Sequence, residues 1–364
     1  MKQTAQRIFG LDIFRALAIL FVLNGHMWSM FLKAAPDRWV RAIAFNGVNV
    51  FFVLSGYLIG NILFKTISEK GPSFANLTTF WRDRWLRTLP EYYCVLIALM
   101  TIVVIYTNKT IYDFRYLFFF SENINGGSNY NLFTESWSLA VEEWFYLLIP
   151  VMLFVGANKM PLKKVVPIII LIVFLFSNAI RVYRVYRYGM LDTGAVFVRI
   201  DNILFGILGA WLSFYQFKIW TNYRNFFFVT GMIGYLGNHF YKAFSGNNLY
   251  NILLQPQIEL LFILMTFPKI AVIKEGKGAI ARIITFISTI SYSIYLLHLS
   301  IFMYAVDPRF PDNPWILIPV YFIWAIGGGY LLYSTVEKWG LKYRNKLRQR
   351  AKDAEILQKS RAIS

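Results

Sequence analysis

Two ionisable side chains lie inside the first apolar stretch of the chain, residues 8–32. Arg15 and His26 are eleven residues apart, almost three helical turns, so a helix would carry both on one face about 16 Å apart. Charged groups inside a bilayer are costly and usually face a bundle interior or a cavity. A histidine there could act as a general base on a hydroxyl group. We predict a functional face; an Asp12–Arg15 structural pair and a satisfied core histidine are the alternative.

A second cluster is the segment FWRDRWLRTLPEYY, residues 80–93. It places Arg82, Arg84 and Arg87 ahead of Pro90, where we expect a helix to begin because proline is tolerated in a first helical turn. Guanidinium groups match the geometry of phosphate oxygens, so arginines at the inner membrane surface could bind phosphate. Positive-inside charge and contact with anionic lipids are the alternative, and charge alone favours it.

Two adjacent carboxylates follow in ESWSLAVEEWFYLLIP, residues 135–150. On a helix, Glu142 and Glu143 point about 100° apart, so one could face a cavity, but the spacing does not say which. A buried carboxylate could support a histidine base, and pairing with an arginine is the competing interpretation. Farther along, Arg199 and Asp201 are two residues apart and are expected to find partners on neighbouring helices.

Other residue types narrow the chemistry. The chain contains no GxSxG elbow, P-loop or HExxH motif, and it has one cysteine, Cys94, and three histidines. We therefore expect no metal site. A histidine base acting directly on a hydroxyl is the simplest transfer chemistry available.

The elements that position these residues are expected to be membrane helices. Hydrophobic residues make up 57% of the 364 residues and charged ones only 15%, against about 25% in soluble domains, which excludes disorder and an ordinary soluble enzyme. A membrane helix needs about 20 mostly apolar residues. The sequence predicts an all-α polytopic membrane protein with about ten such helices: 8–32, 42–64, 89–108, 136–156, 165–180, 193–215, 225–241, 249–268, 283–306 and 313–336.

The distribution of positive charge predicts the orientation. With the N-terminus inside, the inner segments hold 25 lysines and arginines and the outer segments 10, leaving Arg15 and Arg199 in the membrane. The net charge of +18 is therefore assigned to cytoplasmic loops and not to nucleic-acid binding. We expect N-in/C-in topology, a membrane domain over 1–336 and a basic cytoplasmic tail over 337–364, interpreted as a positive-inside flank. Arg181, Arg184 and Arg187 fall on the outer side, as does a loop at 107–135 with sugar-binding residue types.

Together these segments resemble the membrane-bound acyltransferase-3 family over nearly the whole chain. Arg15 and His26 match its Arg-x10-His pattern, and Arg84, Arg87 and Pro90 match its RxxRxxP element. Further similar segments are GVNVFFVLSGYLIG (47–60), WSLAVEEWFY (137–146), RIDNILFGILGAWL (199–212) and SYSIYLLHLSIF (291–302). The pattern selects Glu142 over Glu143. This chain departs from it at Asn49, often an acid, and at Trp339, often proline.

The resemblance implies an acyltransferase of the inner (plasma) membrane. An acyl group, most often acetyl from acetyl-CoA, would pass from the cytoplasmic side to a hydroxyl of an extracytoplasmic glycan or lipid-linked sugar. Arg84 and Arg87 would bind the donor phosphates, Arg15 would line its path, and His26 would be the general base with Glu142 in support. The alternative is a transporter or flippase of lipid-linked sugars or acyl groups without catalysis, since buried charge in a helical bundle suits both.

Overall fold

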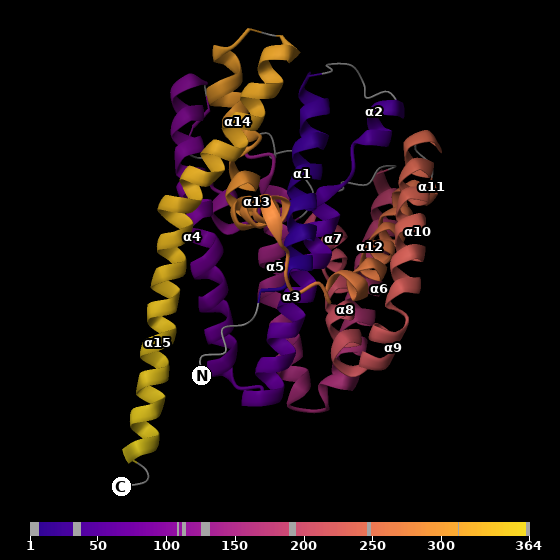
Figure 1. The fold of residues 1–364 in the computed structure, drawn as a ribbon, viewed down its shortest axis with the longest axis vertical. Coiled ribbons are helices and arrows are strands. Elements are labelled where there is room, and N and C mark those ends of the chain that lie inside the picture. The colour runs from indigo at the N-terminus through magenta and orange to yellow at the C-terminus, as the bar shows by residue number, and fades with distance from the viewer. Residues whose placement is uncertain are drawn as a thin grey trace.

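The computed structural model describes residues 7–31, 38–107, 109–110, 114–124, 132–188, 194–245, 249–311 and 313–361. Every regular element in these ranges is helical (Figure 1). The longer helices before residue 245 are α1 (Phe9–Phe31), α3 (Gly47–Lys70), α4 (Phe74–Tyr106), α5 (Ser136–Ala157), α6 (Leu162–Tyr188), α8 (Leu204–Tyr215) and α10 (Arg224–Ser245). They are followed by α12 (Gln255–Ile270), α13 (Gly278–Leu297), α14 (Pro314–Leu332) and α15 (Lys338–Arg361).

Short helical turns connect several of these elements. They are α2 (Arg38–Ile43), η2 (Leu117–Phe119), α7 (Val196–Arg199), η4 (Ile200–Asn202), α9 (Phe217–Asn222), α11 (Leu249–Leu253), η5 (Phe302–Val306), η6 (Asp307–Arg309) and η7 (Tyr333–Glu337).

Eight helical segments among the described residues are long and apolar enough to cross a membrane, which confirms a polytopic all-α protein. They overlap eight of the ten predicted stretches. The predicted stretches 225–241 and 249–268 form α10 and most of α12, which fall short of that criterion. The count of ten and the N-in/C-in orientation therefore stay predictions.

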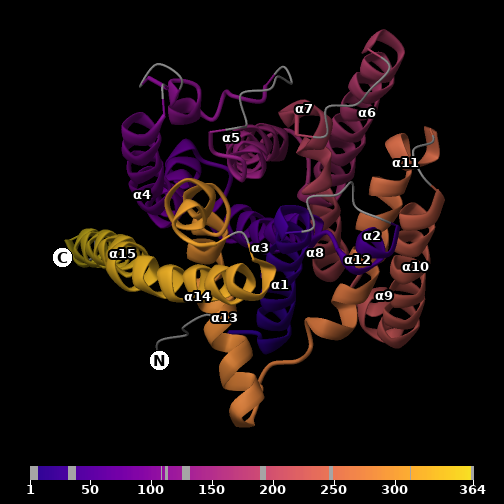
Figure 2. The ribbon, with the colours of Figure 1, turned by 90° about the horizontal axis from the view of Figure 1, so that it is seen from above.

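Helix α3 lies at the centre of the bundle, between α1, α4, α5 and α8 (Figure 2). It packs on α8 through two glycines, because a Cβ on Gly56 would lie 2.0 Å from the carbonyl oxygen of Ile203 and one on Gly206 would lie 2.1 Å from that of Val53. Small residues at such crossings let helix backbones approach closely. This contact fixes α3, which carries one wall of the candidate site.

The bundle has two ends, which we name by their residues. At the basic end α3 stops at Lys70 and α4 starts at Phe74; at the far end α1 stops at Phe31 and α3 starts at Gly47. Helix α14 runs through the π-helical turn η7 into α15, which descends past α4 and extends beyond the basic end (Figure 1). The tail from 337 onward is thus continuous with a membrane-spanning helix.

The expected helix start at Pro90 is wrong. Helix α4 begins at Phe74, where Ser73 caps it by accepting a hydrogen bond from the backbone amide of Asn76, and Pro90 lies inside it. Proline removes one backbone hydrogen bond, but membrane helices tolerate this where neighbouring groups compensate. Arg84 and Arg87 consequently lie about 15 and 20 Å along the helix from Phe74, not at its N-terminus.

Candidate active site

A cavity of about 130 Å³ lies between α1, α3, α4, α5 and α13. Its apolar wall follows α3 from Val48 to Ile62, a length of about 21 Å at 1.5 Å per residue. Four of the five predicted site residues line it, namely Arg15, Arg84, Arg87 and Glu142. Residues distant in the sequence therefore meet in one intramembrane cavity.

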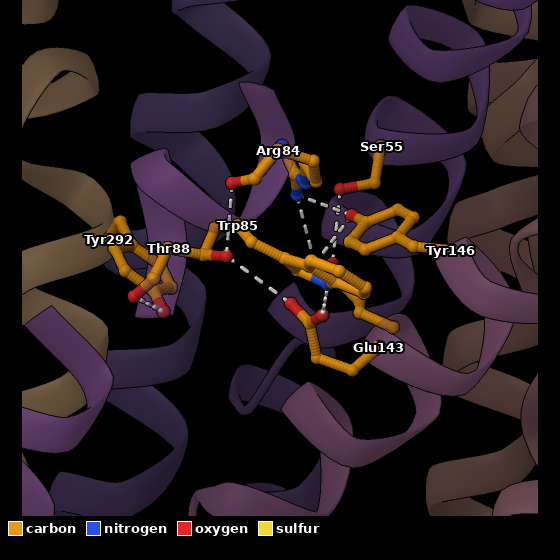
Figure 3. A network of polar contacts seen from close by, with 8 residues as sticks. Ser55, Arg84, Trp85, Thr88, Glu143, Tyr146 and Tyr292 are labelled. Carbon is orange, nitrogen blue, oxygen red and sulfur yellow. Dashed lines mark hydrogen bonds and ion pairs between the residues drawn. The ribbon is translucent and has the colours of Figure 1, made fainter. Parts of the chain in front are cut away.

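Arg84 is the centre of the polar network at this cavity (Figure 3). Its Nη2 donates to the hydroxyl of Tyr146 at 2.5 Å and to Glu142 Oε2 at 3.4 Å. The guanidinium also lies over the Tyr146 ring, 4.2 Å from its centroid. Buried charges need such compensation, so Arg84 is held in one orientation.

Glu142 and Glu143 have different partners, and this settles which of them faces the cavity. Glu142 lines the cavity and accepts hydrogen bonds from Ser55 Oγ at 3.0 Å and from the Tyr146 hydroxyl at 2.7 Å. Glu143 accepts from Trp85 Nε1 at 3.1 Å and from Thr88 Oγ1 at 3.3 Å. Of the two, Glu142 is therefore the one at the cavity, and its carboxylate is held within the Arg84 network.

The charge in the cavity is unbalanced toward positive. Arg15, Arg84 and Arg87 face two carboxylates, Glu142 and Glu337. Asp12 does not add a third, because it pairs with Arg7 at 2.5 Å and accepts from Ser288 Oγ at 2.8 Å. The alternative interpretation, an Asp12–Arg15 structural pair, is therefore not what the structure shows. An excess cation in a low-dielectric site favours a ligand with negative or developing negative charge.

His26, the fifth predicted residue, lies beyond the cavity lining and against a second histidine. Its ring centroid is 5.1 Å from that of His298, which is 5.5 Å from that of Tyr295, a residue of the cavity wall. The far end of the cavity thus leads through Tyr295 to the two histidines. Sequence reasoning did not select His298, although SYSIYLLHLSIF contains it.

A second cavity of about 450 Å³ opens at the basic end. It shares four lining residues with the first, namely Ile59, Ile62, Arg84 and Arg87. Its other basic residues are Lys70, Arg82, Arg344 and Arg348. We call this cavity the mouth; it adjoins the charged cavity at the basic end of the bundle.

Two buried carboxyl groups lie at the far end, outside the membrane-spanning segments. Glu122 accepts a hydrogen bond from Ser136 Oγ at 2.9 Å, and Glu135 accepts from the backbone amide of Ser300 at 3.2 Å. Burial raises the pKa of each carboxyl group to about 7, although the hydrogen bonds that each accepts act to lower it. They fix the segment that enters α5. Residues 108, 111–113 and 125–131 of the outer loop at 107–135, whose residue types suit either sugar binding or a plain solvated loop, lie outside the described residues.

Arg181, which the charge count places on the outer side, does not lie at the surface. It is buried and forms an ion pair with Asp201 at 2.5 Å, linking α6 to η4. This confirms that Asp201 finds its partner on a neighbouring helix. Asn49 also lies buried, with its Nδ2 donating to Glu259 Oε1 at 3.1 Å, so α3 binds α12 where the family pattern often has an acid.

The fold and site define a polytopic helical membrane protein whose interior holds a charged cavity open toward one end. A family model described as an acyltransferase domain matches residues 8–334. The chain therefore belongs to this acyltransferase family, as the sequence resemblance predicted.

The chain is similar to several curated O-acetyltransferases, which are longer proteins. The peptidoglycan O-acetyltransferase OatA of Listeria monocytogenes is 29% identical over 79% of this chain and 48% of its own length. The putative peptidoglycan O-acetyltransferase YrhL of Bacillus subtilis is 28% identical over 55% of the chain and 32% of its length. A putative O-acetyltransferase of Staphylococcus aureus is 31% identical over 40% of the chain and 24% of its length. The chain thus spans about half or less of these relatives, and no solved structure matches it.

Proposed function

We propose that the protein is an O-acyltransferase of the plasma membrane that moves an acyl group, most simply acetyl, from a cytoplasmic acyl-CoA to a glycan hydroxyl on the other side. The observation that carries this proposal is that the mouth adjoins the charged cavity through shared lining residues, and that Tyr295 of the cavity wall packs against the paired histidines. The relatives' names favour peptidoglycan as the acceptor.

The donor would enter with its phosphates at the mouth and its acyl arm along α3. Arg15, Arg84 and Arg87 would attract the donor and stabilise negative charge that develops on the thioester oxygen. The apolar residues of α3 would pack on the arm. Glu142 would act as a positioning residue, because it holds Arg84 by an ion pair.

In the transfer step His26 removes the proton from the acceptor hydroxyl as its oxygen attacks the thioester carbonyl. A carbon–oxygen bond forms, the carbon–sulfur bond breaks, and the thiolate leaves with the proton that the imidazolium returns. The products are an ester on the glycan and free CoA. A general base of this kind contributes about 10²–10⁴-fold to the rate.

Membrane vesicles with acetyl-labelled acetyl-CoA and a peptidoglycan fragment test the proposal. We expect label in the fragment with wild type and a loss of about 10²–10⁴-fold with His26→Ala. His239→Asn is the matched control, since His239 is a buried histidine that hydrogen-bonds the carbonyl of Ala42 on α2. Equal labelling by wild type and His26→Ala would refute the base, and labelled solute crossing the vesicle membrane without ester formation would favour a transporter.

A further inference from the structure

We infer that helix α15 forms one wall of a phosphate-binding site, in which Arg344 and Arg348 take the nucleotide end of the donor. This assigns a ligand to a helix that composition alone marks as a basic flank. The inference rests on the proposed function for the identity of the nucleotide. Its evidence is the charge, packing and unpartnered polar atoms of the mouth.

The mouth gathers charge of one sign from three elements. Lys70 comes from α3, three arginines from α4, and two from α15, against a single lining carboxylate, Asp83. Asp83 pairs with Arg82 at 3.2 Å and with Arg348 at 2.7 Å. The six cations therefore exceed the anions by five, which suits a ligand carrying several phosphate charges.

Helix α15 is fixed against α4 by a close backbone contact. A Cβ on Gly340 would lie 2.7 Å from the carbonyl oxygen of Leu86. Pro90 has no amide hydrogen to bond that carbonyl, so the proline and the glycine together create the place where α15 docks. Arg344 and Arg348, one and two turns farther on, are thereby held over the mouth.

Arg344 has capacity left for a ligand. Its Nε is buried and has no hydrogen-bond partner among the described residues, while its Nη2 donates to Asn345 at 3.3 Å. Leaving a buried donor unpaired costs free energy. A phosphate oxygen would satisfy it, and guanidinium groups bind phosphate through paired donors.

Binding of CoA to the purified chain in nanodiscs tests this site. We expect Arg344→Ala/Arg348→Ala to weaken CoA binding about 10- to 100-fold. The matched control is Lys342→Ala/Lys346→Ala, which removes the same charge from exposed positions of α15 outside the mouth and should leave binding within twofold. Equal losses in both variants, or no loss in either, would overturn the inference.

Two further measurements distinguish lipid phosphate from nucleotide phosphate, and distinguish failure of this inference from failure of the proposed function. Anionic lipid headgroups also carry phosphate, so titration with phosphatidylglycerol vesicles is run beside CoA. Displacement of CoA by these vesicles, or lipid binding without CoA binding, would overturn the nucleotide assignment. If wild type binds CoA through Arg344 and Arg348 but transfers no acetyl group, the proposed function fails and the phosphate site stands.

A second, independent observation concerns His298. Its Nδ1 lies 2.7 Å from the carbonyl oxygen of Tyr295, and a carbonyl only accepts, so Nδ1 carries the hydrogen. The Nε2 of the neutral ring then holds a lone pair, and this buried atom has no partner in the described part of the chain. Only His26 among the histidines lies against this ring.

From this geometry we propose that His298 is a positioning residue for His26. Its Nε2 would accept a hydrogen bond from one ring nitrogen of His26, which leaves the other nitrogen as the base. This role is the one that the sequence suggested for Glu142, whose carboxylate instead holds Arg84. It also rests on the proposed function.

Steady-state kinetics of His298→Leu and His298→Gln test this role. Leucine fills the space without an acceptor, and we expect kcat to fall about 100-fold with the KM for acetyl-CoA within twofold. Glutamine offers an oxygen near the Nε2 position, so kcat of His298→Gln should be at least about tenfold higher than that of His298→Leu. Wild-type activity in His298→Leu, or no rescue by glutamine, would overturn the proposal, whereas full activity in His26→Ala would refute the base itself.

Discussion

At the scale of single residues, Glu142 and Glu143 give a controlled comparison. Both are carboxylates on α5 that accept hydrogen bonds, but only Glu142 pairs with Arg84 and lines the cavity. We expect Glu142→Gln to reduce acetyl transfer on the order of 10²-fold, because Arg84 loses the charge that orients it. Glu143→Gln keeps an acceptor for Trp85 and Thr88, so its acetyl-transfer activity should fall far less. Similar losses in both variants, measured with labelled acetyl-CoA at matched melting temperature, would contradict this distinction.

Glu122 allows a prediction about pH. Burial raises its pKa from the ordinary value of 4.5 to about 7, so ionisation is less favourable in the folded state than in the unfolded one. The free energy of unfolding should therefore fall as pH rises from 4.5 to about 7 and level off above it. Glu122→Gln should flatten that dependence. Melting temperatures between pH 5 and 8.5 in detergent measure it, and an unchanged slope in the variant would contradict the assignment.

Much of the candidate site could be predicted from residue spacing and family resemblance. Arg15, Arg84, Arg87 and Glu142 were selected in this way and meet in one cavity. Glu337 and His298 were missed because each is a single ionisable residue far along the chain, and only packing brings them to α1 and α4. The alternative Asp12–Arg15 pair does not form for a related reason, since helical spacing permits the pair but Arg7 and Ser288 bind the Asp12 carboxylate.

At the scale of elements, apolar length predicted most helices, but it did not predict where α4 begins or that α14 continues into α15. A proline signal was given too much weight at Pro90, and the polar composition of 337–364 gave no sign that this segment packs on α4. Such contacts depend on Gly340 and Leu86, which no periodicity within either segment reveals.

The Gly340 contact predicts the effect of a larger side chain. Gly340→Leu places atoms against the Leu86 carbonyl, so α15 must move at a cost of about 1–3 kcal/mol. We expect CoA affinity to fall as in the Arg344 and Arg348 variant, with Gly340→Ala showing a smaller effect. Gly327→Leu is the control, because a Cβ there meets no atom within 4 Å. Unchanged CoA affinity in Gly340→Leu would show that the position of α15 does not contribute to CoA binding at the mouth.

At the scale of the whole molecule, the charge count and the proposed donor path both predict that the basic end faces the cytoplasm, where acyl-CoA is found. The single cysteine makes this testable. In a Cys94→Ser background, Lys346→Cys lies on an exposed position of α15, and Phe119→Cys lies on η2 at a position 79% exposed. A membrane-impermeant maleimide should label Phe119→Cys in cells with an intact plasma membrane and Lys346→Cys only after permeabilisation. The reverse pattern would put the mouth outside, away from the donor, and would exclude cytoplasmic acyl-CoA as the source of the transferred group.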